Sequence, residues 1–216
     1  QESERRVILA NVLIRKKSYS EAIKLLSLHQ PQGALASYEL FDLGVAHIKE
    51  GRFITGIANL NDMIRLAGSD DESLNLKDKA ALVIAYQYLK NGNYQDARNS
   101  LLRVRLEGLY SNSALLTLAY AHYLNKEYEK ALPATLELQS RNPADPTVQE
   151  AFLLGARIYE DLGAKNQAIA SYRIGTLTLR DQLVQLERTA LRIDADNWPD
   201  VLAPAQVNTN DAIHST

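Results

Sequence analysis

The residues of this chain that could carry acid–base or metal chemistry are few and lie far apart. The four histidines, His29, His47, His122 and His214, show no HExxH motif and no other metal-ligand spacing. His47 and His122 fall at a position that tyrosines occupy in sister segments, so we expect packed, partly buried imidazoles there. Cysteine is absent, which excludes disulfides, thiolate catalysis and cysteine metal sites.

Two further patterns resemble ligand-binding motifs but lack the neighbouring residues or elements that such motifs need. Gly44, Gly51 and Gly56 do not follow a predicted strand, so they do not form a phosphate-binding loop. The acidic run at residues 70–72 lacks the alternating ligands of a calcium loop, and we predict a solvated loop instead. The sequence therefore predicts no catalytic residue, no metal and no cofactor, and an enzyme is the least favoured class of function.

The composition is ordinary for a globular protein and excludes few partners. The 216 residues carry a formal net charge of -2, with 46% hydrophobic and 23% charged residues. This balance gives no general attraction to nucleic acid or to an anionic membrane. No stretch approaches the roughly 18 apolar residues of a membrane span. The chain starts at Gln1, which fits a trimmed mature start or an excised domain equally well. The absence of cysteine fits a bacterial periplasm or cell envelope slightly better than a cytosol.

Small residues recur along the chain in two parallel lines, and these determine the predicted architecture. The lines keep a constant offset of twelve residues, and both step by 34, 41, 34 and 37 residues. Alanine or glycine at such positions lets the two helices of a hairpin approach closely. The sequence thus predicts five helical hairpins. The first line is Ala10, Gly44, Ala85, Ala119 and Ala156, and the second is Ala22, Gly56, Ala97, Ala131 and Ala168.

The stretch from Ser113 to Asp145 shows one unit most fully. It contains two amphipathic segments with Ala119 and Ala131, an aromatic between them at Tyr128, and a closing proline. This pattern resembles the tetratricopeptide (TPR) repeat, and the resemblance covers about residues 4–175. It implies an all-α, right-handed superhelix of five helix-turn-helix repeats, whose first helices line a concave face. The expected repeats span about residues 4–33, 35–68, 76–109, 111–145 and 147–176, with a polar loop at 68–73 before the third.

One long helix is predicted after the repeats, from about Asn166 to Arg192, so that array and helix together cover residues 1–193. Its leucines continue past the last repeat, and two interpretations stay open. The helix folds back as a cap, or it forms a dimer seam or a dock for a neighbouring domain. Residues 194–216 show no period and are rich in Asn, Asp, Thr and Pro, which predicts a flexible tail with Trp198 as its candidate anchor.

The concave face follows from helical spacing, because positions three before, one after and four after each small residue of the first line share one side. In the middle of the array these positions are apolar or aromatic, and the flanking charges change from basic to acidic along the chain. We therefore predict a groove for an apolar partner segment, whose charged ends would fix its polarity. The predicted groove residues are Phe41, Leu82, Tyr86, Leu116, Tyr120, Tyr123, Lys49, Lys90, Arg157 and Glu160, with Asp161 beside them.

The resemblance implies a protein that binds helices or peptides of other proteins. Our leading hypothesis is a non-catalytic interaction scaffold with a protein partner. The alternative is a structural self-assembly or docking module that forms a homo-oligomer through the long C-terminal helix. One TPR subgroup holds the C-terminal carboxylate of chaperones with Lys, Asn and Arg side chains. Asn11 matches that set, but Val7 replaces a lysine and Asp42 replaces an asparagine, which argues against this subgroup.

Overall fold

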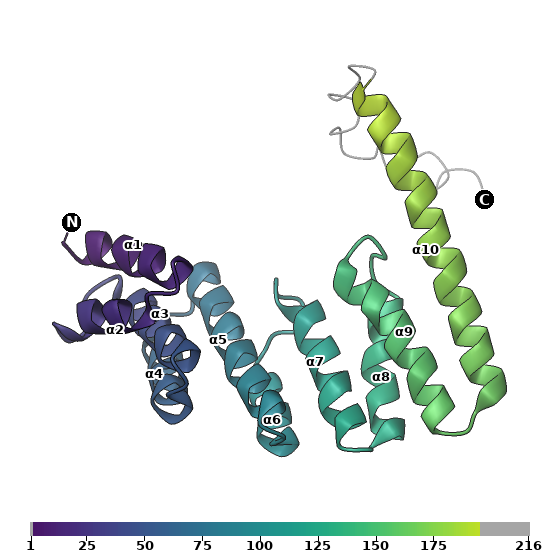
Figure 1. The fold of residues 1–216 in the computed structure, drawn as a ribbon, viewed down its shortest axis with the longest axis horizontal. Helices are drawn as coiled ribbons and strands as arrows, with labels where there is room; N and C mark the ends of the chain where they lie inside the picture. Colours follow the sequence, from purple (N-terminus) through teal and green to yellow (C-terminus); the bar gives the residue numbers. More distant parts are fainter. Residues whose placement is uncertain (1, 195–216) are drawn as a thin grey trace, which may run out of the picture.

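The computed structural model describes residues 2–194, and the regular secondary structure of this part of the chain is entirely α-helical. Within it, ten helices follow one another as five hairpins, each closed by a short turn and linked to the next by a loop (Figure 1). The all-α class and the repeat architecture predicted from the sequence are confirmed. The helices are α1 (Glu2–Arg15), α2 (Tyr19–Ser27), α3 (Ala36–Lys49), α4 (Phe53–Leu66), α5 (Asp71–Lys90), α6 (Tyr94–Leu101), α7 (Ser111–Leu124), α8 (Tyr128–Gln139), α9 (Pro146–Asp161) and α10 (Lys165–Asp194).

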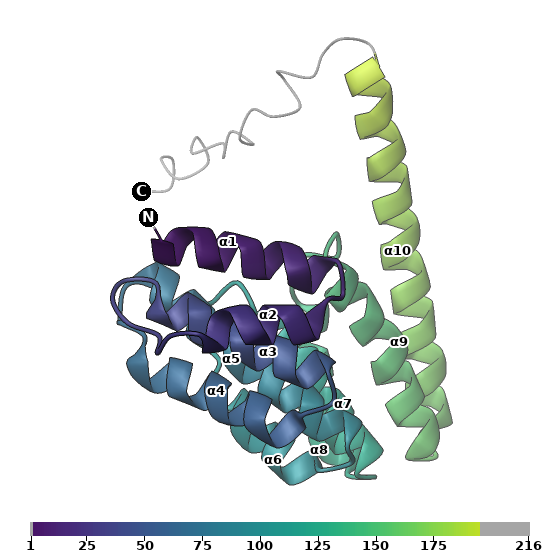
Figure 2. The same cartoon turned by 60° about the vertical axis from the view of Figure 1, so that its left-hand side comes forward.

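Each hairpin stacks against the next (Figure 2). The apolar core therefore runs through the whole array. The second helix of one hairpin contacts the first helix of the following one at α2–α3, α4–α5, α6–α7 and α8–α9. The buried clusters accordingly combine side chains from adjacent repeats. Leu43 and Ala46 of α3, for example, pack with Ala10 and Ala22 of the first hairpin. This nearest-neighbour packing is the mode by which helical repeat proteins are stabilised.

The two lines of small residues lie where the helices of each hairpin meet. The eight alanines are at most 3% exposed, and both glycines are buried. The closest approach occurs in the second hairpin. A Cβ atom on Gly56 would lie 2.7 Å from the Gly44 carbonyl oxygen, and one on Gly44 would lie 2.7 Å from Leu60 Cγ. The packing of α3 on α4 therefore requires glycine at both positions.

A third feature that recurs in every repeat is a residue with positive φ in the turn between the two helices of the hairpin. One residue in each turn has a φ between 59° and 87°, the left-handed region. Glycine adopts this conformation freely, whereas another residue is destabilised there by about 1–2 kcal/mol. The position is glycine in three turns and lysine in two, so residue types alone do not reveal the shared geometry. These residues are Lys17, Gly51, Gly92, Lys126 and Gly163, and they step by the same 34, 41, 34 and 37 residues.

The third repeat begins earlier than the sequence predicts. The polar segment 68–73 is not a loop throughout, because α5 starts at Asp71 and is 20 residues long. Asp70 caps this helix by accepting a hydrogen bond from Ser73 N at 2.9 Å. Asp71 and Glu72 then lie in the first turn, where the helix dipole favours negative charge. The prediction of a solvated loop is therefore wrong from Asp71 onward, and a longer helix takes up much of the 41-residue step.

A buried carboxylate anchors the segment that follows the short helix α6. Asp78 is 2% exposed. Its Oδ1 accepts a hydrogen bond from Arg105 N at 3.1 Å, and its Oδ2 accepts one from Arg105 Nε at 2.8 Å. Arg105 also donates from NH2 to Asn75 Oδ1 at 2.7 Å. This network ties residues 102–110 back to α5.

The longest helix, α10, covers α9 with its first half only. Gly175 is buried against α9, whereas most side chains from Arg180 onward are exposed. The second half extends beyond the array (Figures 1 and 2). The predicted long helix is confirmed, but its interpretation as a cap folded back over the array is wrong for this half. The predicted tail at 194–216, including Trp198, lies outside the described residues except for Asp194, which ends α10.

Candidate functional site

An apolar groove crosses the first helices of the second, third and fourth repeats. It has a volume of about 420 Å³ and is lined from α3, α5 and α7, with one residue of α9 at its end. Tyr86, which is 58% exposed, offers a large aromatic surface within it. A concave apolar surface with a few converging polar groups is the usual form of a binding site. The apolar lining is Val45, Ile48, Leu82, Val83, Tyr86 and Leu116, and the polar lining is Lys49, Gln87, Ser113, Thr117 and Thr147.

The groove runs obliquely across the repeats rather than along equivalent positions. On α3 its lining residues follow the small residue Gly44, on α5 they surround Ala85, and on α7 they precede Ala119. On α9 the groove meets only Thr147, in the first turn. Each repeat thus shifts the lining by about one turn, or 3.6 residues, toward the helix N-terminus. The sequence prediction places the groove at the same helix positions in every repeat. It therefore cannot predict a groove that shifts along the helices from one repeat to the next.

Four of the ten predicted groove residues line this groove: Lys49, Leu82, Tyr86 and Leu116. Phe41 does not, because it is 8% exposed and belongs to the core of the second and third repeats. Its ring lies 5.0 Å from Lys79 Nζ, a cation–π contact within the fold. The prediction for Phe41 is wrong because the groove crosses α3 one turn closer to the C-terminus. Lys90 is exposed at the end of α5, outside the groove lining.

Tyr120 and Tyr123 belong to a second, polar surface between α7 and α9. The Tyr120 hydroxyl donates to Glu150 Oε1 at 2.6 Å, and the Tyr123 hydroxyl donates to Asp161 Oδ2 at 2.8 Å. Burial and the bond to Glu150 raise the pKa of Tyr120, and the bond to Asp161 raises the pKa of Tyr123. Both hydroxyls stay protonated and link the fourth repeat to the fifth. The prediction that these tyrosines line one groove with Tyr86 is therefore wrong.

The acidic end predicted for the groove also lies elsewhere. Arg157 NH1 is 3.7 Å from Glu160 Oε2, and Arg157 Nε is 3.5 Å from Asp161 Oδ2. These groups are at the C-terminal end of α9, whereas the groove meets α9 at Thr147. Thr147 and Glu160 are 13 positions apart in the sequence, which is about 20 Å along the helix. Of the predicted charged residues, Lys49 alone lines the groove.

Asn11 and Asp42, the positions compared with the carboxylate-binding subgroup, contact each other. Asn11 Nδ2 donates to Asp42 Oδ2 at 2.8 Å. Asp42 is 7% exposed, and burial raises its pKa to about 6. The amide of Asn11 is thus engaged with a carboxylate of the protein itself. This contact agrees with the sequence argument against a chaperone-type carboxylate clamp.

His47 and His122 pack into the repeats as predicted, whereas His29 is exposed. His47 is 8% exposed, and burial lowers its pKa below the ordinary value. His122 is partly buried, and its Nδ1 lies 2.9 Å from Glu127 Oε2. In the described part of the chain, no three His, Asp or Glu side chains converge as metal ligands. No helix between residues 2 and 194 has the length and apolar character needed to cross a membrane.

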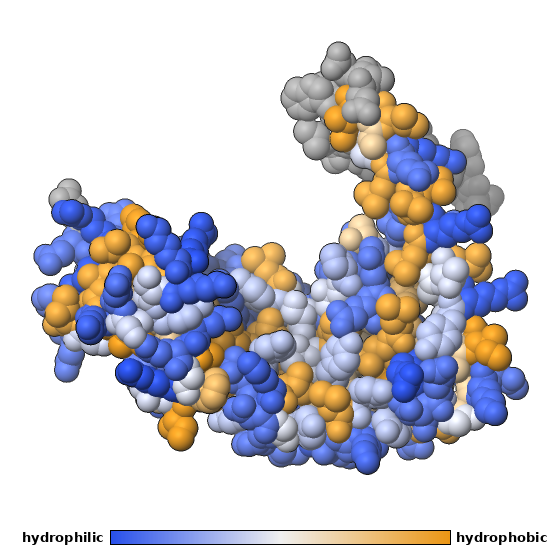
Figure 3. Space-filling view, viewed as in Figure 1, coloured by the Kyte–Doolittle hydropathy of each residue, from blue (hydrophilic) through white to orange (hydrophobic). Residues whose placement is uncertain are grey.

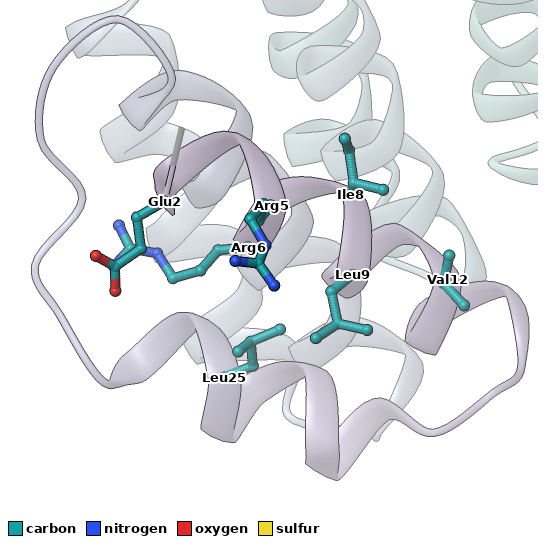
Figure 4. A pocket seen from close by; sticks show the side chains of 7 residues that line it. All are labelled: Glu2, Arg5, Arg6, Ile8, Leu9, Val12 and Leu25. Atoms are coloured by element: carbon teal, nitrogen blue, oxygen red, sulfur yellow. The ribbon is translucent and has the colours of Figure 1, made fainter.

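A second cleft lies at the N-terminal end of the array, between α1 and α2 (Figure 4). Leu9 in this cleft is the repeat equivalent of Leu43 and Ile84, which are buried against the hairpin that precedes each of them. Leu9 itself is 48% exposed. The cleft thus has the character of a stacking face between repeats. It measures about 710 Å³ and is lined by Glu2, Arg5, Arg6, Ile8, Leu9, Val12 and Leu25.

These features define an array of stacked helical hairpins of the TPR type. No protein-family model matches the sequence, and comparison with curated proteins finds no match. Solved structures do match. The TPR-like repeats of a kinesin light chain from Podosopora anserina align with a TM-score of 0.60 and 15% identity over 83% of this chain and 95% of theirs.

Two further solved structures share this arrangement. A MamA fragment from Desulfovibrio magneticus RS-1 aligns with a TM-score of 0.64 and 15% identity, over 84% of this chain and 97% of its own. The apo form of RapI aligns with a TM-score of 0.69 and 13% identity, over 93% of this chain and 80% of its own. At such low identity the matches show the fold, and they support the TPR-type architecture.

Proposed function

We propose that this chain is a non-catalytic protein-interaction scaffold, which holds an apolar segment of a partner protein in the groove across α3, α5 and α7. The observation that carries this proposal is the open apolar groove itself, with the ring of Tyr86 exposed in it. Exposed aromatic anchors in such a surface typically contribute much of the energy of an interface. The TPR-type fold, which displays its first helices side by side, supports this role.

The chemistry of the lining restricts the occupant. Leu82, Tyr86 and Leu116 offer an apolar floor that fits the apolar face of a helix or alternate side chains of an extended strand. The polar edge carries neutral hydroxyl and amide groups that can bond to a peptide backbone. Lys49 is the cation at the α3 end. We therefore expect a segment with spaced apolar side chains and an acidic residue near the end that lies against α3.

A peptide-library selection on the folded chain tests this proposal. Peptides selected on the wild type should bind the Tyr86→Ala variant about thirtyfold more weakly, which corresponds to about 2 kcal/mol. The matched control is Ile54→Ala on α4, because Ile54 is 88% exposed but lies outside the groove. Equal affinity for the wild type and Tyr86→Ala, with helical circular dichroism unchanged, would show that the groove is not the binding site.

Charge reversal at the groove end provides a kinetic test of the same site. Lys49→Glu should slow the association of acidic peptides and weaken its dependence on salt, because long-range attraction acts mainly on the association rate. The same reversal at Lys90, which is exposed outside the lining, should change the rate less. An equal or larger effect at Lys90 would place the acidic part of the peptide outside the proposed groove.

A second candidate function is self-assembly or docking through α10. The observation in its favour is the row of exposed apolar side chains on the half of α10 that leaves the array. This role and groove binding use different surfaces and are compatible in one molecule.

A further inference from the structure

The apolar residues of α10 form a seam with the spacing of a coiled coil. Eight successive positions, three and four residues apart in strict alternation, carry seven apolar or aromatic residues and one threonine. This heptad spacing is the pattern by which two helices pair along a common line. The a positions are Ile169, Thr176, Leu183 and Ala190, and the d positions are Tyr172, Leu179, Leu186 and Ile193.

The seam is exposed where α10 leaves the repeats. Leu183 is 56% exposed, Leu186 63% and Ile193 49%, although all three are large and apolar. Figure 3 shows apolar side chains running along this part of α10. The side of α10 that packs on α9 carries the small residues Ala168 and Gly175, one position before each a residue. The start of the seam also contacts α9, because the Tyr172 hydroxyl donates to Glu160 Oε2 at 3.1 Å and Leu179 is half-buried. Packing on α9 therefore leaves the seam available from Leu183 onward.

The charges beside the seam suit a second copy of this chain in antiparallel orientation. In an antiparallel pair, a residues of one helix face d residues of the other, and one such register packs Leu183 of each copy against Leu186 of the other. This register also sets Leu179 against Ala190. It brings the e position Arg180 beside the e position Glu187 of the second helix, and the twofold symmetry repeats this ion pair.

A parallel pair does not offer this complementarity. There, e positions lie beside g positions, so Arg180 would face Gly175 and Glu187 would face Gln182. Neither contact pairs opposite charges. The antiparallel arrangement also sends the two repeat arrays to opposite ends of the paired helices.

We propose that two copies of this chain pair through the second half of α10 as an antiparallel two-helix coiled coil, with Leu183 of one copy packed against Leu186 of the other. The groove across α3, α5 and α7 takes no part in this contact. The pairing therefore stands or falls independently of the function proposed for the groove.

The mass of the full chain in solution tests the pairing. Sedimentation equilibrium should show a concentration-dependent dimer of about twice the 24.1 kDa chain mass. Leu186→Glu should abolish the dimer, because a charge at a d position must be buried in the seam. The matched control is Leu191→Glu, which alters a residue that is 70% exposed on the same helix but off the seam, and it should stay dimeric. A wild type that is monomeric at all concentrations, or a dimer that survives Leu186→Glu, would overturn the proposal.

Charge exchange and cross-linking test the orientation. Arg180→Glu should weaken the dimer, and adding Glu187→Arg should restore it, because the exchanged charges again meet their opposites. A natural chain without cysteine lets introduced thiols report single contacts. Leu179→Cys with Ala190→Cys should give a disulfide-linked dimer, whereas each single substitution should not. These two positions are about 16 Å apart along one helix, too far for a bond within a chain. Efficient cross-linking of the single variants would indicate a parallel pair and overturn the antiparallel assignment.

Discussion

Asp42 of α3 is a buried carboxylate whose ionisation should lower the stability of the fold at neutral pH. It is 7% exposed, and burial is the main cause that raises its pKa to about 6. Lys79 and the hydrogen bond from Asn11 oppose this shift without cancelling it. Asp42→Asn removes the charge and keeps an oxygen that can accept from Asn11.

The direction of the pH dependence follows from the two pKa values. In the unfolded chain Asp42 titrates near its ordinary value of 3.8, whereas in the folded chain it titrates at about 6. Between these values the folded state binds more protons, so the contribution of this group falls as pH rises and is lost above pH 6. A difference of about two pKa units corresponds to about 3 kcal/mol. Asp42→Asn should therefore stabilise the protein by up to about 3 kcal/mol above pH 7 and have little effect near pH 4.

Urea unfolding of wild type and Asp42→Asn, compared at each pH, measures this effect directly. The comparison cancels groups common to both proteins, including His47, whose lowered pKa makes stability fall as pH falls. The wild type should lose stability relative to the variant between about pH 4 and pH 6. A variant that is less stable than the wild type above pH 7 would refute the reasoning, because it would show that Lys79 compensates the buried charge.

Three further substitutions test the architecture. Asp78→Ala should lower the unfolding free energy by about 2 kcal/mol, because it removes the buried acceptor of Arg105, which is itself part-exposed and can be hydrated; an unchanged urea midpoint would contradict this. Lys126→Gly should raise the unfolding free energy by about 1 kcal/mol, and with it the melting temperature, because φ is 59° there; a lower melting temperature would count against strain at that turn. Ala119→Leu should overpack the fourth hairpin by about 1–3 kcal/mol, and calorimetry that shows no loss would contradict the close approach.

The fold could be predicted because its main constraint is local and periodic. The contact between the helices of a hairpin depends on residues twelve apart, so Ala119 and Ala131, or Gly44 and Gly56, mark it in any repeat. The early start of α5 could also have been predicted, because Asp70 is a favourable N-cap residue followed by acidic residues. The geometry of the turns could not be predicted, because Lys126 adopts a backbone conformation that is typical of glycine.

The groove could be predicted only in part, because its course depends on how successive repeats are rotated. Leu82, Tyr86 and Leu116 were found by helical spacing, since the groove crosses the middle of the array near those heights. The prediction for Phe41 is wrong because the equivalent position on α3 is buried in the core. The prediction for Tyr120 is wrong because its hydroxyl bonds to Glu150, which lies 30 residues away in the next repeat. Such contacts follow from the packing between repeats and leave no local pattern in the sequence.

Site-specific photo-cross-linking from the groove tests the central claim most directly. A photoreactive benzophenone amino acid replaces Tyr86 in one variant and Ile54, which is exposed on α4 outside the groove lining, in the other. Both are irradiated in cells that produce the protein, and adducts are mapped by mass spectrometry. The groove account predicts a discrete adduct from position 86, joined to an apolar segment of one partner protein, and no such adduct from position 54. An adduct of equal yield from both positions, or one from position 54 alone, would contradict it.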